Sequence, residues 1–416
     1  MTKIAERGLL YIANARIPTE KAHGLQIMKM CSEFALRLEV ELLVPHRFQT
    51  RSMKQVADAY EYYGVERKFS IRRIFSLNLT PPLDSRLSYW TQWVQGLMYW
   101  PQSILFGLVS AVYTMTRSVK LVYSRDFLTC LFLFLCQRLH RKRVFFEAHD
   151  LPLTKLGRRI RCWPLRHISG LVVISGRLGE LYQTEGIPPE KILVAPDGVD
   201  LPLFSRELQK KSVRQELSIP HEKTVICYTG HLYRWKGAHV LAQAMKILPD
   251  DCLFCVVGGT PQDIMEFKEF STTNRIPNVM VVGYVPPGMV PRYLAAADVL
   301  VLPNTSEEAI SRLYTSPLKL FEYMAARRPI VASDLPSIRE ILNEDNAVMV
   351  RPDEPQALAE GIMKVLKDGE LARKLVENAF RDAHLYTWEK RAERILNFIG
   401  ERCRNGRSSL MNASGK

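Results

Sequence analysis

Residues 315–326 combine a helix start suited to an anion with a carboxylate one turn further on. Ser316 can cap this helix, and Pro317 fits its first position, where a missing N–H costs nothing. The backbone N–H groups of Leu318 and Lys319 would then point out of the helix start. Unpaired N–H groups at a helix N-terminus favour negative charge, so the segment predicts a phosphate site.

Glu322 extends this site, because it lies one turn beyond Leu318 and shares its face of the helix. An ionised carboxylate only accepts hydrogen bonds, so it can hold a vicinal diol such as that of a ribose. A phosphate at the helix start and a ribose on the carboxylate together indicate a nucleotide. On this segment alone, an ordinary capped helix with a surface glutamate is an equally good interpretation.

The elements that must position this helix are a series of short apolar runs, which predict the strands of a parallel sheet. These runs are 224–230, 253–259, 279–285, and those near 299, 330 and 348–350. Glycine or polar residues follow at successive carboxyl edges, where such sheets bind ligands. They are 230–237, 258–259, 283–285, Asn304 and 316–322. Several edges with the same character favour a binding site more than any one of them.

Two cations follow the first of these strands. Gly230 begins the loop, and Arg234 and Lys236 within it can neutralise a diphosphate. Gly237 permits a close approach of the backbone to its neighbours or to a ligand. The alternative is that both cations are ordinary solvated side chains near a helix start.

The first half of the chain is organised in the same way and begins with a β-α-β unit over residues 8–44. The loop 14–24 follows its first strand, and Gly24 would let a backbone or a ligand approach closely. No G-x-G-x-x-G is present, so a dinucleotide site lacks its fingerprint.

Arg125 and the pair His149-Asp150 follow two later strands of this half, at 119–123 and 144–148. His149 can donate to a sugar hydroxyl or a phosphate, or transfer a proton. Arg125 can meet an acceptor or a phosphate. The alternatives are a structural histidine beside the sheet and a surface arginine.

Two similar α/β halves therefore stand in tandem, each predicted to form a doubly wound parallel sheet with Rossmann-like connections. We expect an N-terminal domain over 1–204, a linker over 205–222, and a C-terminal domain over 223–390. Residues 391–416 would form a helix end and a tail that is disordered from 404 onward. The carboxyl edges of the two sheets can face one another across a central cleft.

The net charge of +14 is uneven, since residues 1–204 carry 28 Lys and Arg against 17 Asp and Glu. A basic half indicates a polyanionic partner, which can be an anionic membrane, an anionic acceptor or nucleic acid. No zinc-finger or RNP sequence is present, which argues against nucleic acid.

The segment 87–116 carries no charged residue and includes Trp90, Trp93 and Trp100. It is long enough to cross a bilayer, but Pro101 would break one long helix. We therefore expect one or two partly buried helices at a membrane interface. The N-terminus enters a strand without a signal peptide, so we expect a cytoplasmic protein, peripheral on the inner face of a membrane.

Several chemistries lack their sequence signatures. No Asp-x-Asp ends a strand where a metal would hold a diphosphate, and neither G-x-S-x-G nor a P-loop is present. Cys252 and Cys255 are three apart on an apolar strand and face opposite ways, so they predict free buried thiols of a reducing compartment. What remains is a nucleotide diphosphate site built from cations and amides, without a metal or other cofactor.

Motifs in both halves resemble those of the retaining glycosyltransferases of family 4. The similar segments are 230–237, 257–259, 283–285, 302–303, 316–325 and 329–334, with 195–200 similar to the interdomain motif and 14–24 and 147–150 to the acceptor-side loops. The resemblance extends over residues 8–390. It implies a GT-B fold, a nucleotide-sugar donor and metal-independent transfer with retention of configuration.

The same resemblance implies roles for individual residues, with His149 and Glu322 as the catalytic candidates. The donor diphosphate would be bound by Gly230, Arg234, Lys236, Ser316 and Leu318. The ribose and base would be bound by Glu322, Gly259, Tyr284 and Val285. The acceptor side would include His23, Gly24, Arg125 and Asp150.

The chain departs from that family at two positions. The family often has a second glutamate eight residues before the ribose-binding one, and Tyr314 stands there instead. His231 stands where an arginine is common. We expect transfer of a sugar to a glycan or lipid-linked acceptor at the membrane. The alternatives are a nucleotide-sugar epimerase of the UDP-GlcNAc 2-epimerase type and a non-catalytic subunit that binds sugar nucleotides and docks on a membrane.

Overall fold

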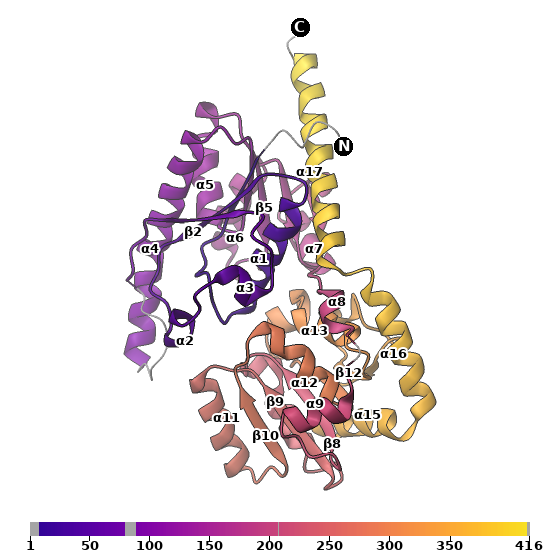
Figure 1. The fold of residues 1–416 in the computed structure, drawn as a ribbon. Helices are drawn as coiled ribbons and strands as arrows, with labels where there is room; N and C mark the ends of the chain where they lie inside the picture. The colour runs from indigo at the N-terminus through magenta and orange to yellow at the C-terminus, as the bar shows by residue number, and fades with distance from the viewer. Residues whose placement is uncertain (1–7, 80–88, 207, 414–416) are drawn as a thin grey trace. The chain divides into compact units, whose positions relative to one another are not determined.

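The computed structural model describes residues 8–79, 89–206 and 208–413, with the side chains of all of these except 89–97 and 405–413. The chain divides into two compact units (Figure 1). The first unit joins Met1–Pro196 to Trp388–Lys416, and the second unit is the continuous segment Asp197–Thr387. Each unit has its own parallel sheet, as the sequence predicts.

The sheet of the first unit has seven parallel strands in the order β3-β2-β1-β4-β5-β6-β7. Its central strand β4 and the neighbouring strand β1 are buried at every position, because helices cover both faces of such a sheet. The strands are β1 (Leu9–Ile12), β2 (Val40–Pro45), β3 (Ser70–Ile74), β4 (Leu121–Ser124), β5 (Arg143–Ala148), β6 (Gly170–Val173) and β7 (Ile192–Val194).

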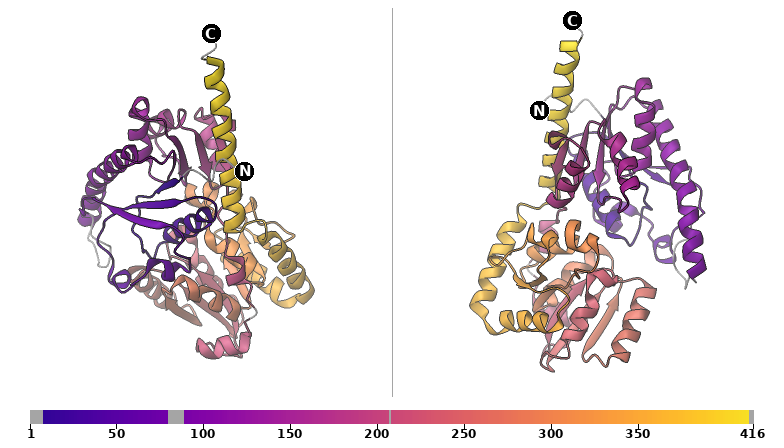
Figure 2. Two further views of the ribbon diagram at one scale, coloured as in Figure 1. Left: turned by 45° about the horizontal axis from the view of Figure 1, so that its top comes forward. Right: turned by 180° about the vertical axis from the view of Figure 1, so that it is seen from behind.

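The helices of the first unit include the last helix of the chain. They are α1 (Ala22–Ala35), α2 (Arg51–Lys54), α3 (Ala59–Tyr63), α4 (Tyr89–Thr116), α5 (Phe127–Leu135), α6 (Lys155–Leu165), α7 (Gly176–Thr184) and α17 (Trp388–Ala413). Helix α17 lies alongside α1 (Figures 1 and 2). It continues to Ala413, where the sequence predicted disorder from residue 404, and residues 414–416 of that prediction lie outside the described residues.

Helix α4 corrects the prediction that Pro101 breaks the uncharged segment. The helix runs through Pro101 without interruption and lies against α5 (Figure 1). Its inward face, with Gln102, Phe106 and Ser110, is fully buried. Packing of that face offsets the lost backbone hydrogen bond, because tertiary contacts override local propensity. Residues 87–88 of the predicted segment, and the side chains of Trp90 and Trp93, lie outside the described part. No helix in the described ranges is both long and apolar enough to cross a membrane.

The second unit contains six parallel strands in the order β10-β9-β8-β11-β12-β13. They are β8 (Thr224–Thr229), β9 (Cys252–Val257), β10 (Val279–Gly283), β11 (Val299–Leu302), β12 (Ile330–Ser333) and β13 (Val348–Val350). Its helices are α8 (Leu201–Phe204), α9 (Lys210–Glu216), α10 (Ala238–Ala244), α11 (Pro261–Thr273), α12 (Val290–Ala296), α13 (Leu318–Ala325), α14 (Pro336–Arg339), α15 (Pro355–Lys367) and α16 (Gly369–Ala383).

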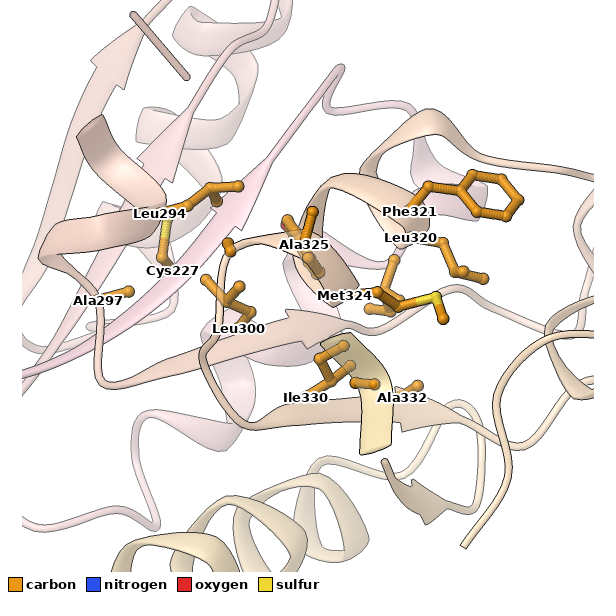
Figure 3. Packing of buried hydrophobic residues seen from close by; sticks show 14 of the residues in the cluster. Cys227, Leu294, Ala297, Leu300, Leu320, Phe321, Met324, Ala325, Ile330 and Ala332 are labelled. Carbon is orange, nitrogen blue, oxygen red and sulfur yellow. The ribbon is translucent and has the colours of Figure 1, made fainter. Parts of the chain in front are cut away.

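Helix α13 is fixed to this sheet by its apolar face. Phe321, Met324 and Ala325 are fully buried and belong to one cluster with Leu300 of β11 and Ile330 of β12 (Figure 3). A helix held by this much apolar contact is a rigid platform for the polar residues at its start.

The predicted linker 205–222 is part of the second unit. Helix α9 lies within it, and Arg214 of that helix is 4% exposed. The Arg214 Nη2 atom donates to Asp298 Oδ2 at 2.6 Å, and Nε donates to the Ala296 carbonyl at 2.9 Å. These long-range bonds anchor a segment whose polar composition alone indicated a flexible connection.

Candidate functional site

The carboxyl edge of the second sheet carries a row of glycines in the left-handed region of φ. Gly230, Gly258 and Gly283 follow or end β8, β9 and β10 with φ of +125°, +112° and +87°. The Gly230 amide donates to the Val257 carbonyl, and the Gly258 amide donates to the Gly283 carbonyl. A Cβ on Gly258 would lie 2.5 Å from the Gly230 carbonyl oxygen, so a side chain has no room there. The glycines therefore bring three loops together at one edge.

The loop after β8 is locked against the end of β11 at Gly237. This residue has φ +73°, and a Cβ there would lie 1.7 Å from the Pro303 carbonyl oxygen. The Thr305 amide donates to the Trp235 carbonyl at 2.9 Å. These contacts fix the backbone on both sides of Lys236.

Lys236 is the half-buried cation of this loop. Its Nζ lies 4.0 Å from the position that a Cβ on Gly230 would occupy, and 5.2 Å from the centroid of the Trp235 ring. Burial lowers its pKa to about 8, and Asp263 partly offsets this effect. Arg234 is exposed, and its charge acts on His239, whose pKa is lowered by burial first and then by Arg234. The structure thus places Lys236 beside Gly230.

The start of α13 differs from the predicted cap. Pro317 occupies the N-cap position with no side-chain cap bond, and the helix begins at Leu318. The Ser316 hydroxyl instead accepts a hydrogen bond from the Asp197 amide at 3.3 Å. Ser316 therefore ties the first residue of the second unit to this loop. The first amides of the helix, beginning with Leu318, still have no partner within the helix, which is general for helix starts.

Glu322 lies one turn into α13 as predicted. Burial raises its pKa to about 7, and the neighbouring Lys319 opposes that rise. The Tyr323 hydroxyl accepts from the Thr229 amide at 2.8 Å, which joins α13 to the end of β8. Glu322 is thus held next to the Gly230 edge, where a carboxylate acceptor for a diol was predicted.

Gly259, Tyr284 and Val285 lie at the edge formed by β9 and β10. Gly259 has φ +91°, and a Cβ there would lie 3.1 Å from a methyl carbon of Leu232. Tyr284 and Val285 are half-buried directly after β10. His231 stacks on Tyr233 with ring centroids 5.0 Å apart, and its Nδ1 lies 3.8 Å from the Asp263 carboxylate.

In the first unit, Glu147 of β5 is the centre of a buried charged cluster that the sequence did not predict. Its carboxylate is 3.2 Å from Arg391 Nη2 and 3.7 Å from Arg125 Nε, and it accepts a hydrogen bond from the Tyr123 hydroxyl. The His149 Nε2 atom lies 2.7 Å from Glu147 Oε1. Burial alone would raise the pKa of Glu147, but Arg391 and Arg125, followed by His149, hold it well below its usual range.

The other predicted residues of the first unit have local partners. Asp150 pairs with Arg161 at 2.5 Å. His23 and Gly24 lie in the first turn of α1, where the sequence predicted a loop. A Cβ on Gly24 would lie 2.3 Å from the Tyr63 hydroxyl, so packing within the unit by itself requires a glycine there.

Sequence reasoning missed three charged side chains, those of Glu147, Lys319 and Arg391, and named Asn304 only as one of the polar residues at the sheet edge. Glu147 and Lys319 were visible as charges inside apolar stretches, which is a usable signal of a buried functional group. Asn304 is 0% exposed and directly follows the β11 region. Arg391 offered no local signal, because its partner Glu147 is far away in the sequence. Within the described residues, no group of three or more His, Cys, Asp and Glu side chains is placed to hold a metal ion.

Comparison with protein families supports the motifs of the second unit. The family model described as Glycosyl transferases group 1 matches residues 209–382. TuaC of Bacillus subtilis (strain 168), named as a candidate teichuronic acid biosynthesis glycosyltransferase, is 31% identical over 172 residues, which are 41% of this chain and 40% of that protein. A D-inositol 3-phosphate glycosyltransferase of Xylanimonas cellulosilytica is 27% identical over 232 residues, 53% of this chain and 54% of its own. The chain thus matches about half the length of these curated relatives.

Solved structures resemble almost the whole chain. Anabaena HepE, in complex with UDP and glucose, matches 95% of this chain and 100% of its own with a TM-score of 0.71 and 17% identity. Sucrose-phosphate synthase of Thermosynechococcus elongatus matches 97% and 100%, with a TM-score of 0.72 and 18% identity. At these identities the likeness establishes the fold alone. Together with the two parallel sheets, it confirms the predicted GT-B class.

Proposed function

We propose that this chain is a glycosyltransferase that moves a sugar from a nucleoside diphosphate donor to a glycan or lipid-linked acceptor. The observation that carries the proposal is the position of Lys236 beside Gly230, at the edge where α13 presents its first amides and Glu322. The match of residues 209–382 to the group 1 glycosyltransferases supports it. So does HepE, of similar fold, which was solved with UDP and with UDP-glucose.

In the proposed reaction, the bond between the anomeric carbon and the donor phosphate breaks while the acceptor oxygen bonds to that carbon. The acceptor hydroxyl attacks from the face that the diphosphate leaves, so the configuration is retained. Its proton passes to a phosphate oxygen of the leaving group. Lys236 and the start of α13 stabilise the negative charge that develops on the diphosphate, which is the function a metal ion would otherwise serve.

We also propose that the first unit docks on an anionic membrane through helix α6 and the residues before it. Four apolar side chains are exposed there, three or four residues apart, as expected for one side of a helix and the turn that precedes it. They are Leu153, Leu156, Ile160 and Trp163. Basic residues flank them in sequence, namely Lys155, Arg158, Arg159, Arg161 and Arg166. Apolar insertion combined with attraction to anionic headgroups is the usual basis of peripheral binding.

A panel of nucleotide sugars tests the donor proposal. A donor that binds only the native chain raises the thermal midpoint. The donor that raises the thermal midpoint most is then incubated with the protein and a cell-derived glycolipid fraction. Transfer is measured as the amount of nucleoside diphosphate released. If Lys236→Ala leaves transfer from every donor unchanged, this site assignment is wrong. Product NMR would show an epimerised free nucleotide sugar if the chain were an epimerase.

Tyr314 favours one alternative, a subunit that binds sugar nucleotides without turning them over. It is 6% exposed at the end of a π-helical turn, Ile310–Tyr314, and replaces the glutamate common in the family. Calorimetry that shows donor binding, with no turnover on any acceptor fraction, would support this alternative over transfer.

A further inference from the structure

Lys319 is a buried amine without a hydrogen-bond partner. The residue is 6% exposed, and its Nζ makes no hydrogen bond. The Nζ lies over the face of the Tyr228 ring, 3.9 Å from the ring centroid. An ammonium group taken out of water without hydrogen bonds is strongly unfavourable, so such a residue needs an explanation.

The position of Lys319 relates it to the proposed donor site. Its Cδ and the Nζ of Lys236 each lie 4.0 Å from the point that a Cβ on Gly230 would occupy. Both lysines therefore border the space that a side chain on Gly230 would fill. A glycine that leaves this space open beside two lysine side chains makes room for a ligand with negative charge.

Asn304 is a second buried polar residue at the same edge. It is 0% exposed, and neither its Oδ1 nor its Nδ2 makes a hydrogen bond. It follows β11, which neighbours β8 in the sheet, and its backbone nitrogen lies 3.3 Å from the position of a Cβ on Gly237. Buried amides are nearly always satisfied, so two unsatisfied residues at one edge indicate a ligand that supplies the missing bonds.

We propose that Lys319 is a second cation for the donor diphosphate, neutral in the empty site and protonated from solvent when the nucleotide sugar binds beside Lys236. The inference rests on the proposed function and extends it to a proton that is taken up with the donor. Asn304 would contribute neutral hydrogen bonds to the same ligand.

The groups that face Lys319 favour its neutral form when the site holds no ligand. They are Lys236 from the loop after β8, Glu322 from its own helix, and Cys227 and Tyr228 from β8. Burial is the main cause that lowers the pKa of Lys319, the charge of Lys236 lowers it further, and Glu322 opposes both. A diphosphate adds negative charge between the lysines and reverses this balance.

The test uses the full chain and the tightest binder among UDP-glucose, UDP-N-acetylglucosamine, GDP-mannose and ADP-glucose. The diphosphate of these compounds has no proton to lose near neutral pH. Lys319→Met is expected to raise the thermal midpoint of the empty protein, because it replaces a buried unpaired amine with an apolar side chain of similar length. The same variant is expected to lose at least tenfold in affinity. A purely structural lysine would not move the two quantities in opposite directions.

Calorimetry in buffers of different ionisation enthalpy measures the proton directly. Wild type is expected to take up close to one proton more per bound nucleotide sugar than Lys319→Met. The same comparison in the Glu322→Gln background removes the titration of that carboxyl group. Lys319→Gln is a second variant for the case that methionine at this position impairs folding. The matched control is Lys246→Met, which changes an exposed lysine of the same unit.

Equal affinity and equal proton uptake in wild type and both Lys319 variants would overturn this inference and leave the proposed function standing. If wild type binds none of the four nucleotide sugars, the proposed function fails and the inference fails with it.

Discussion

Arg391 of α17 lies 3.2 Å from Glu147 of β5, measured from Nη2 to Oε1, and both residues are at most 2% exposed. The Arg391 Nε atom also donates to the carbonyls of Ala195 and Pro196 at 3.3 and 3.1 Å. One side chain from the last helix thus neutralises a buried carboxylate and holds the backbone where the first unit is interrupted.

Replacing Arg391 by Met should destabilise the protein by about 3 kcal/mol, because it breaks a buried ion pair and leaves the Glu147 carboxylate with only Arg125 and His149 to balance its charge. For a unit of this size the thermal midpoint falls by roughly 6–12 °C. Arg373→Met is the matched control, since the Arg373–Glu377 pair is exposed and contributes little. The double variant Arg391→Met, Glu147→Gln should recover part of the loss in calorimetric scans. No recovery would mean that the charge of Glu147 is not the cause.

The pKa of Lys236, about 8 in the empty protein, sets the pH dependence of donor binding. The side chain is mostly charged at pH 7 and mostly neutral at pH 9, so binding of an anion weakens with rising pH. The slope of log Kd against pH should therefore become steeper by up to one unit above pH 8. Lys236→Arg should lack this change of slope, because arginine stays protonated. Calorimetric titrations of both proteins between pH 6.5 and 9 measure the slope. A wild-type slope that is constant across pH 8 contradicts the prediction.

Glu322→Gln should stabilise the empty protein while it weakens donor binding. The pKa of Glu322 in the folded state, about 7, lies above its unfolded value, so the native carboxyl binds its proton more tightly than the unfolded one. The wild-type group therefore lowers stability progressively as pH rises from about 4.5 to 7. The variant should be more stable by up to about 3 kcal/mol above pH 7, with no difference near pH 4. Urea unfolding at pH 4.5 and 8 measures this.

The control for that experiment is Glu269→Gln, at an exposed position of α11 in the same unit. It should change stability little at either pH. A Glu322→Gln variant that is less stable than wild type at pH 8 would show that the carboxylate is satisfied by partners and does not wait for a diol.

Gly237→Ala should destabilise the second unit by about 2–3 kcal/mol, because alanine at φ +73° is strained and its Cβ meets the Pro303 carbonyl. Movement of the loop displaces Lys236, so nucleotide-sugar affinity should fall with stability. Gly288→Ala is the matched control, since a Cβ there has no heavy atom within 4 Å. Thermal scans measure the stability of both variants, and calorimetric titrations measure their affinity for the nucleotide sugar. If Gly237→Ala matches Gly288→Ala in both measurements, the loop is not held as described.

Ile160→Ser should reduce binding to vesicles that contain anionic lipid by about tenfold, because burying one isoleucine side chain contributes roughly 1.5–3 kcal/mol. Ile247→Ser is the control, because Ile160 and Ile247 are similarly exposed at 51% and 46% and lie in different units. Sedimentation with vesicles at low and high salt separates the electrostatic contribution to binding from the apolar one. Equal binding by the two variants would remove α6 from the docking surface.

The sequence was most informative where the structure depends on continuous apolar runs. Strands such as β8 and β11 were predicted because buried parallel strands are apolar throughout, and the loops at their carboxyl edges followed from that. The glycines Gly230 and Gly237 indicated tight backbone geometry, and the structure shows which neighbours require it.

Features that depend on distant partners were not predictable in this way. Ser316 has the composition of a helix cap, yet its hydroxyl bonds the Asp197 amide, which only the folded second unit brings near. Pro101 predicts a break in isolation, but the packed face of α4 overrides it. Arg214 lies in a polar stretch typical of linkers, and its burial depends on Asp298 in another element. Each case needs knowledge of a contact between segments far apart in sequence.

The interrupted first unit has a consequence for synthesis on the ribosome. All of the second unit, Asp197–Thr387, emerges between the two pieces of the first. At usual translation speeds this takes roughly 10–40 s, during which β5 carries Glu147 without Arg391. Closing the nascent first sheet over that carboxylate before then costs more free energy, because only Arg125 and His149 are present to balance its charge, whereas the second unit is already continuous and can fold. Helix α17, which is synthesised after the whole of the second unit, is thus the element that completes the first one.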